Sequence, residues 1–370
     1  MNSLARVALL TLALSTSVSA MNSHLIFLGT YTRNGSKGIY TVRLDDDTGV
    51  LSTPQLVAET PNPTWVTLSP DKKFLYTIHP SAAQAIGYRV EAESGRLTPL
   101  APAPLAPAAN APSHLAVDAT GRTLLAANYA DGFVAALPIR PDGTLGAPHL
   151  IRHSGHGPNP QRQEKPHVHS VTLSPDNRFV IVCDLGLDRI FSYALDPAEA
   201  QLTPATPPFV EAPATSGPRH FKFGLDGRHA YALTEMGATI VAYDYAAANG
   251  ALTPIQTVSM LPPDFQARWG AEVRVHPNGK FLYGSNRGHD SIAVFAIDPA
   301  SGKLASVEIV PTGGKTPRNF SLSPDGKWLV CGHQDSENLT VFRVDPATGR
   351  LTRLPGEAAV PACVCVLFYN

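Results

Sequence analysis

Short runs of alternating apolar and polar residues recur along the chain at nearly constant intervals. Each repeat also contains a tight corner of Ser-Pro-Asp-Gly type between two apolar runs. Six such corners occur, at residues 69–72, 118–121, 174–177, 224–227, 276–279 and 323–326. Alternation with period two is typical of half-buried β-strands, and Pro, Asp and Gly favour tight turns. Self-similarity at this spacing predicts a repeat architecture built from strands.

A second marker, an Asp/Ser-Gly-x-Leu type turn, recurs at a spacing similar to that of the corners. It ends at seven leucines spaced 46 to 57 residues apart: Leu51, Leu97, Leu145, Leu202, Leu252, Leu304 and Leu351. Alternating stretches such as Gly38–Leu44, Arg189–Asp196, Ser291–Asp298 and Asn338–Asp345 precede these turns. Each repeat therefore holds four strands, and four antiparallel strands in roughly 50 residues is the size of a β-propeller blade.

The two ends of the chain complete the count of blades. The second strand of the repeat occurs seven times, at Ile26–Tyr31, Leu75–Ile78, Leu124–Asn128, Val180–Cys183, Ala230–Thr234, Leu282–Ser285 and Leu329–Gly332. A first strand precedes only six of these, and Ala362–Phe368 at the C-terminus resembles the missing one. We therefore expect an all-β, seven-bladed propeller over residues 21–370, with one blade closed by both termini so that no long sheet edge is open. Long helical patterns are absent, which argues against a Rossmann or hydrolase fold.

Composition and the N-terminus narrow the class of protein. The net charge is −1, charged residues make up 16%, and there is no basic run, so we do not expect a nucleic-acid partner. Residues 1–20 have the pattern of a secretory signal peptide: Arg6, an apolar core at Val7–Leu14, and Val18-Ser19-Ala20 as a cleavage site. This predicts a periplasmic or secreted protein with no membrane association after cleavage. If translation starts at Met21, the protein is instead cytoplasmic.

The four cysteines do not have the spacing of a metal site. Cys183, Cys331, Cys363 and Cys365 all fall in predicted strands, where thiols usually pack as small buried apolar groups. We favour that role, while a disulfide stays open in an oxidising compartment. A closed propeller needs no partner chain, so we expect a monomer.

Strand order predicts where a binding site would lie. The tight corners must share one rim of the ring, so the starts of first strands and the ends of second strands meet at the opposite rim, near the axis. Polar residues gather at these positions: His114, His167, His169, Arg219, His220, Glu272, Arg318, Asn319, Asn128, Asp184, Glu235, Asn286, Arg287, His333 and Gln334. Convergent polar groups at a concave mouth indicate a ligand site. A channel lined by mutually satisfied ion pairs and water is the alternative.

The longest repeat contains an extended loop on the same rim. The loop spans His149–His169, and a long loop in a compact repeat is more often functional than not. It holds five histidines, but no His-Glu-x-x-His, cysteine-pair or carboxylate pattern of a metal site, so we predict no metal and no cofactor. The chain also lacks the Gly-x-Ser-x-Gly elbow and the nucleotide-binding glycine fingerprint.

Several motifs together resemble a known family. They are Phe27-Leu28-Gly29-Thr30-Tyr31-Thr32, Arg162-Gln163-Glu164, Pro166-His167-Val168-His169-Ser170, Gly217-Pro218-Arg219-His220, Ser285-Asn286-Arg287-Gly288 and Lys315-Thr316-Pro317-Arg318-Asn319-Phe320. Over residues 24–370 the chain is similar to the lactonase family of seven-bladed propellers. That family includes propeller-type 6-phosphogluconolactonases and, more distantly, fungal carboxymuconate-lactonizing enzymes.

The resemblance implies a hydrolase that opens a lactone ring with water and needs no cofactor. It implies catalytic roles for His169, Arg219, Glu235 and Arg287, with the choice of general base between His169 and Glu235 left open. From the convergent rim we expect further substrate contacts from Arg162, Gln163, His167, Asn128, Glu272, Asn286, Arg318 and Gln334.

The expected partner is a small lactone or sugar acid. The signal peptide leaves it open whether this substrate is phosphorylated, because phosphorylated sugar lactones are cytosolic metabolites. A muconate-type cycloisomerase and a non-catalytic propeller that binds small carboxylates or sugars are the alternatives.

Overall fold

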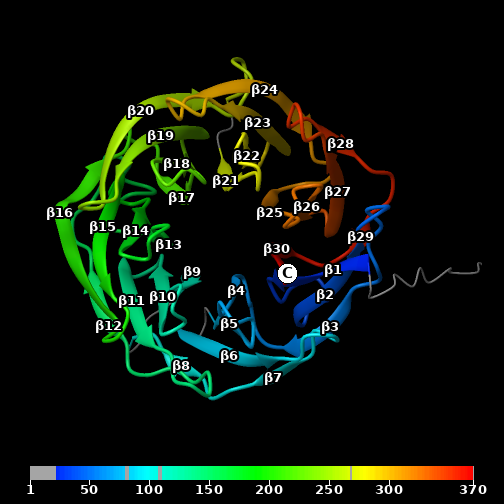
Figure 1. The fold of residues 1–370 in the computed structure, drawn as a ribbon, viewed down its shortest axis with the longest axis horizontal. Helices are drawn as coiled ribbons and strands as arrows, with labels where there is room; N and C mark the ends of the chain where they lie inside the picture. The colour runs from blue at the N-terminus through cyan, green and yellow to red at the C-terminus, as the bar shows by residue number, and fades with distance from the viewer. Residues whose placement is uncertain (1–21, 80–82, 107–110, 267–268, 370) are drawn as a thin grey trace, which may run out of the picture.

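Seven four-stranded antiparallel sheets are arranged around a common axis (Figure 1). The computed structural model describes residues 22–79, 83–106, 111–266 and 269–369. The proposed signal peptide lies outside the described residues. No helix in the described part of the chain is long and apolar enough to cross a membrane.

Each of the first four blades begins with an inner strand beside the axis and ends with an outer strand at the surface. Blade 1 consists of β30 (Cys363–Phe368), β1 (Ser23–Thr30), β2 (Gly38–Asp45) and β3 (Gln55–Glu59). Blade 2 consists of β4 (Val66–Leu68), β5 (Phe74–His79), β6 (Gln84–Val90) and β7 (Leu97–Pro99), with the short β8 (Ala103–Pro104) also on β6. Blade 3 consists of β9 (Pro112–Val117), β10 (Thr123–Asn128), β11 (Phe133–Pro138) and β12 (His149–Arg152). Blade 4 consists of β13 (Val168–Leu173), β14 (Phe179–Asp184), β15 (Arg189–Asp196) and β16 (Gln201–Glu211).

The other three blades follow the same plan. Blade 5 consists of β17 (Pro218–Phe223), β18 (His229–Thr234), β19 (Thr239–Ala246) and β20 (Ala251–Ser259). Blade 6 consists of β21 (Gly270–Val275), β22 (Phe281–Asn286), β23 (Ser291–Ile297) and β24 (Leu304–Pro311). Blade 7 consists of β25 (Pro317–Leu322), β26 (Trp328–His333), β27 (Asn338–Val344) and β28 (Leu351–Arg353), with the short β29 (Ala358–Ala359) also on β27.

Closure of the ring by both termini is confirmed. β30 pairs with β1 in an antiparallel register that runs from Ile26↔Phe368 to Thr30↔Cys363. The last strand of the chain is thus the inner strand of the blade whose other three strands come from the N-terminus. The ring therefore has no unpaired inner edge at the junction of the termini.

The second strand of each blade is an almost continuous apolar run because both of its faces are covered by neighbouring blades. All six residues are buried in each of β10, β14, β18, β22 and β26. Strands on the outer surface differ: β16 is exposed along most of its length, and only Leu202 in it is buried. The burial needed to hold the ring together is thus concentrated between blades.

Tyrosines in the second strands tie neighbouring blades together. The hydroxyl groups of Tyr76, Tyr231 and Tyr283 donate hydrogen bonds to the carbonyl oxygens of Gly143, Gly302 and Gly349 at 3.1, 3.0 and 2.9 Å. Each of these glycines has a positive φ, so the turn at the end of the next blade can approach closely. The repeated Gly-x-Leu turn is therefore part of the contact between blades.

The Ser-Pro-Asp corners are structural, as expected. The hydroxyl oxygens of Ser69, Ser174 and Ser323 accept hydrogen bonds from the first backbone N–H of the following strand at 2.9–3.0 Å. These hydroxyls stabilise the corner itself. The four cysteine thiols are buried and unpaired, in keeping with a packing role.

Candidate active site

Five inner strands each contain a β-bulge at the same level, and these bulges surround a cavity at the centre of the ring. In β9, β13, β17, β25 and β30 one extra residue stands opposite the second strand, and this residue is Ser113, His169, Arg219, Arg318 or Val364. All five line one cavity. A bulge redirects the side chain of the extra residue, so the repeat brings distant sequence positions to one place.

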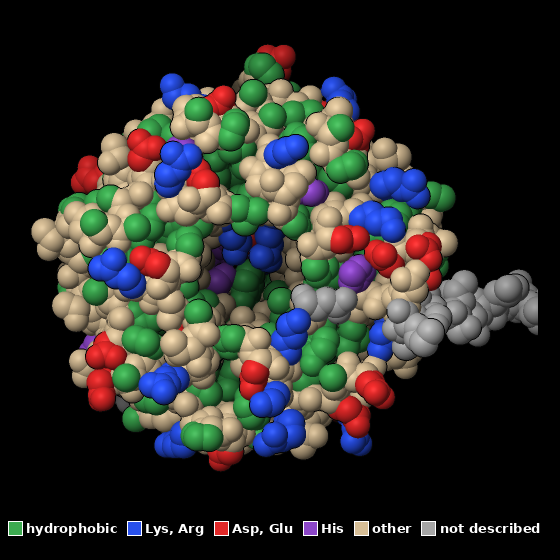
Figure 2. All heavy atoms as spheres, in the orientation of Figure 1, with side chains coloured by type: hydrophobic (Ala, Val, Ile, Leu, Met, Phe, Trp, Pro, Cys, Tyr) green, Lys and Arg blue, Asp and Glu red, His purple; other side chains and the backbone are tan. Residues whose placement is uncertain are grey.

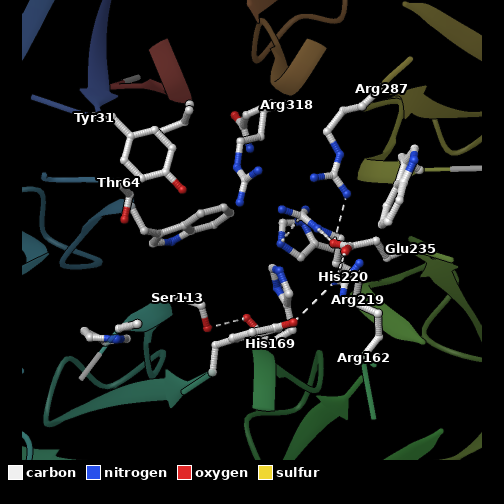
Figure 3. A pocket seen from close by; sticks show the side chains of 17 residues that line it. Tyr31, Thr64, Ser113, Arg162, His169, Arg219, His220, Glu235, Arg287 and Arg318 are labelled. Carbon is white, nitrogen blue, oxygen red and sulfur yellow. Dashed lines mark hydrogen bonds and ion pairs between the residues drawn. The ribbon is translucent and has the colours of Figure 1, made fainter. Parts of the chain in front are cut away.

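The cavity has a volume of about 430 Å³ and opens at the centre of one face. Figure 2 shows this hollow, with Lys or Arg and His side chains inside it. Seven charged or imidazole side chains expected from the rim and its long loop converge there (Figure 3): Arg162, His169, Arg219, His220, Glu235, Arg287 and Arg318. The four residues with implied catalytic roles are thus brought together, although they come from three blades.

Glu235 is the centre of the charged network. It follows β18, is 5% exposed, and contacts three guanidinium groups. The distances from its carboxylate oxygens are 2.6 Å to Arg162 Nη2, 3.0 Å to Arg219 Nε and 2.9 Å to Arg287 Nη2. Burial alone would raise the pKa of Glu235, but attraction by Arg287 and Arg219 outweighs it, so the pKa lies well below the usual value. Glu235 is therefore a carboxylate at all physiological pH values.

The arginines outnumber the carboxylates in the cavity. Burial, together with repulsion from Arg287 and Arg318, lowers the pKa of Arg219 to about 9, so its guanidinium is still charged at neutral pH. Arg318 has no hydrogen bond or ion pair within the described chain, and its guanidinium lies 5.8 Å from the ring centre of Tyr31. With four arginines and one glutamate lining it, the cavity carries three positive charges in excess. Such a site is suited to an anion.

His169 is held as a neutral imidazole beside these charges. It is 6% exposed, and its Nδ1 atom has no hydrogen-bond partner. Burial and the neighbouring Arg219 lower the pKa of His169 well below its usual value. A neutral imidazole has an unprotonated nitrogen that can accept a proton, whereas the Glu235 carboxylate is already engaged by three arginines.

Behind Arg219, as seen from the cavity mouth, lies a second group of polar residues: His220, Glu272 and Asn319. Arg219 Nη1 donates a hydrogen bond to His220 Nε2 at 3.2 Å, which places the His220 proton on Nδ1. That Nδ1 lies 3.2 Å from Glu272 Oε2, without the alignment of a hydrogen bond. Glu272 is fully buried and also accepts a hydrogen bond from Asn319. Arg219 is thus oriented from two sides, by Glu235 and by His220.

Six of the eight expected substrate contacts do not line the cavity. The side-chain amides of Asn128, Gln163 and Asn286 are used in local hydrogen bonds, to Asp131 N, to Leu185 O and to Met260 O respectively. His167 stacks on Tyr129 and bonds to its carbonyl oxygen, Glu272 is in the group behind Arg219, and Gln334 bonds to Asp335. The structure holds these six outside the cavity because polar groups at strand ends also stabilise the turns that follow, and their contact with substrate stays a prediction. Arg162 and Arg318 do line the cavity.

Aromatic walls of the cavity were missed by the sequence reasoning. Tyr31, Trp65, Tyr129 and Trp269 line it, and Trp269 packs against Arg162 and Arg287 at 5.1 and 6.0 Å from ring centre to guanidinium. Tyr31 and Tyr129 directly follow second strands, at the rim positions whose polar residues predict the ligand site. An aromatic residue directly after a second strand was therefore the sequence feature that could have predicted these two walls.

The loop of the longest repeat contributes to the site through Arg162. Its His153 instead bonds to Asp184 Oδ2 at 2.6 Å and to Tyr193 at 2.9 Å, inside blade 4. Among the described residues, the side chains close enough to share a metal ion are His24, Asp46 and Asp325, which do not line the cavity.

Comparison with known proteins places this arrangement in a family. Residues 25–368 match the family described as "Lactonase, 7-bladed beta-propeller". A 6-phosphogluconolactonase from Bacillus subtilis is 38% identical over 95% of this chain and 99% of its own length. The solved structure of a periplasmic gluconolactonase from Pseudomonas aeruginosa is 34% identical with a TM-score of 0.88, covering 94% of this chain and 99% of that one. A 6-phosphogluconolactonase from Serratia proteamaculans is 31% identical over 75% of this chain and 79% of its own length.

Proposed function

The chain belongs to the lactonase family of seven-bladed β-propellers, and we propose that it hydrolyses the ring ester of a sugar-acid lactone. The observation that carries the proposal is the neutral, buried His169 beside the arginine-rich cavity. Lactone opening needs a base for the attacking water, stabilisation of an oxyanion and a site for the carboxylate product. The cavity has residue types suited to each task.

In the proposed reaction His169 is the general base. It takes a proton from water as the water oxygen attacks the ring carbonyl carbon, and it later returns that proton to the ring oxygen as the C–O bond breaks. Its pKa is low in the empty cavity because burial and Arg219 disfavour the imidazolium. Negative charge developing on the substrate opposes both effects, so the imidazolium is stabilised when it forms. A base of this kind contributes roughly 10²–10⁴-fold in rate.

Arg219 and Arg287 stabilise the oxyanion and then the product carboxylate. Both contact Glu235, which fixes their direction before substrate arrives. Preorganised donors of this kind cost no reorganisation during the reaction, and a planar guanidinium binds two carboxylate oxygens at once. In this role Glu235 orients the arginines and takes no proton.

Arg318 and the aromatic walls favour a sugar substrate that carries its own negative charge. Arg318 is the cavity arginine without a partner in the described chain, so it is available to bind a carboxylate or phosphate. The rings of Tyr31, Trp65 and Trp269 offer apolar faces for the C–H groups of a sugar ring.

We also propose that residues 1–20 are a signal peptide and that the mature protein acts outside the cytoplasm. The apolar core and the small residues before Met21 support this, and so does the likeness to a periplasmic gluconolactonase. Cell fractionation with an antibody to the protein tests the location: recovery in the cytoplasm at full length would contradict it.

The test of the reaction is a pH-stat assay with phosphorylated and unphosphorylated aldonolactones, on wild-type protein with and without a chelator. We expect acid release well above the spontaneous rate, loss of this rate in His169→Gln, and retention in the surface variant His149→Gln. Saturable binding of sugar acids with no turnover of any lactone would instead identify a non-catalytic propeller.

A further inference from the structure

A second cavity lies further along the inner strands, toward the corner rim. Its volume is about 210 Å³, and strands β4, β9, β13, β17, β21 and β30 line it. Trp65 lines both this lower cavity and the active site, and its ring packs against His114 of the lower cavity and His220 of the active site, with ring centres 3.9 and 5.4 Å apart. None of the residues with proposed catalytic roles lines the lower cavity.

Two positive side chains stand next to each other in this cavity. Lys222 is paired in register with Tyr231, and Arg274 with Tyr283, which is the same position in neighbouring blades. The matching positions of other blades hold uncharged residues, Thr67, Ala116, Thr172 and Ser321. The positive charge is therefore confined to one side of the channel.

This charge is incompletely balanced by the protein. Arg274 is 3.6 Å from Glu272 Oε1 and donates Nε to Phe320 O at 3.3 Å. The ammonium group of Lys222 has no hydrogen bond or ion pair in the part of the chain that the structure describes, and no carboxylate there lines the cavity. Glu272 also faces His220, so one carboxylate serves several donors. A partly buried ammonium without a counter-charge is unfavourable.

A buried histidine adds an unused polar atom. His114 is 4% exposed and lines the lower cavity, and its Nδ1 has no hydrogen-bond partner.

Burial, together with repulsion from Arg274, lowers the pKa of Lys222 to about 8, as expected for a cation that lacks a partner. The structure thus holds two cations and an orphaned imidazole nitrogen around one small space.

We propose that the lower cavity is a second binding site, for a small free oxyanion of the phosphate or sulfate class held between Lys222 and Arg274. A lysine and an arginine together are a common pair for such oxyanions, because they combine a point charge with a planar set of N–H donors. The volume is about half that of the active site, which favours a small ion over a sugar phosphate. The proposal is independent of the lactonase reaction.

Crystals of the wild-type protein soaked in selenate provide the direct test, because selenium scatters anomalously. We expect one peak between Lys222 and Arg274, whether or not a second peak occupies the active site. A selenate peak confined to the active-site cavity, or no peak at all, would overturn the proposal.

Calorimetric titration with inorganic phosphate provides a test in solution. Lys222→Met removes the charge and keeps the bulk, and Lys280→Met, on the exposed surface, is the matched control. We expect Lys222→Met to weaken the lower site on the order of tenfold or more, and Lys280→Met and Arg318→Met to leave that site unchanged. An isotherm of Lys222→Met identical to that of the wild type would count against the site.

Discussion

Replacement of Glu235 by glutamine tests the central electrostatic feature of the active site. The substitution keeps the size of the side chain and one acceptor oxygen, but it removes the negative charge that three arginines share. The Glu235 side chain is 6% exposed and that of Arg219 is 3% exposed, so solvent cannot replace the lost charge. Breaking a buried ion pair by removing one partner typically costs about 3–5 kcal/mol.

We expect a loss at the low end of that range, about 3 kcal/mol, because Arg162 and Arg287 are more exposed and can turn toward water. Activity should fall as well, since Arg219 and Arg287 lose the carboxylate that fixes the orientation of their guanidinium groups. Displacement of a catalytic group by about 1 Å can cost on the order of 100-fold in rate. Both effects follow from one lost charge.

Chemical denaturation and lactone hydrolysis at pH 7 measure the two effects. The control is Glu91→Gln, which breaks the exposed pair of Glu91 with Arg96 at 3.1 Å and should change neither quantity measurably. A Glu235→Gln protein as stable as the wild type, with kcat/KM within twofold, would refute the view that Glu235 organises the arginines.

Four further outcomes are expected. His169→Gln should lower kcat roughly 10²–10⁴-fold with little change in KM, and steady-state kinetics would contradict its role as base if kcat were retained. Arg318→Met should raise KM for an anionic lactone about tenfold while kcat changes less, and an equal effect on a neutral lactone would argue against charge recognition. Since the pKa of Glu235 is lower in the folded protein than in the unfolded one, its contribution to stability is present above pH 4.5 and is lost as the pH falls further; melting temperatures between pH 6 and pH 3 should therefore drop more steeply for wild type than for Glu235→Gln. Truncation after Ala362 removes β30 and opens the edge of β1, so we expect little soluble monomer by size-exclusion chromatography, and a folded, active truncated protein would contradict closure by the C-terminal strand.

The fold was largely predictable because the same pattern of strands and turns occurs seven times in the sequence. An error in one strand is corrected by its counterparts, as when Ala362–Phe368 was assigned by its resemblance to other first strands and proved to be β30. The four residues with proposed catalytic roles do lie in one cavity, since topology alone brings strand starts such as Arg219 and strand ends such as Glu235 to the same rim.

Individual contacts were harder to predict, because polar residues at strand ends have two possible roles. Asn128 and Asn286 are the last residues of β10 and β22, one position before the place that Glu235 holds after β18, and their amides bond to the backbone of their own turns or of a nearby loop. A side-chain amide can satisfy a backbone group without a charge, whereas a buried carboxylate needs cations. The strand-end residues that do line the cavity stand directly after the second strands, at Tyr31, Tyr129, Glu235 and Arg287.

The bulge in the inner strands explains why this rim can hold so much charge. Without it, strand alternation would let only every second residue of β17 face the axis, so Arg219 and His220 could not both do so. The extra residue allows both to point inward, with His220 behind Arg219 as its hydrogen-bond acceptor. Because His220 and Glu235 then fix Arg219 from within the fold, the cavity can keep several guanidinium groups close together before any anion arrives.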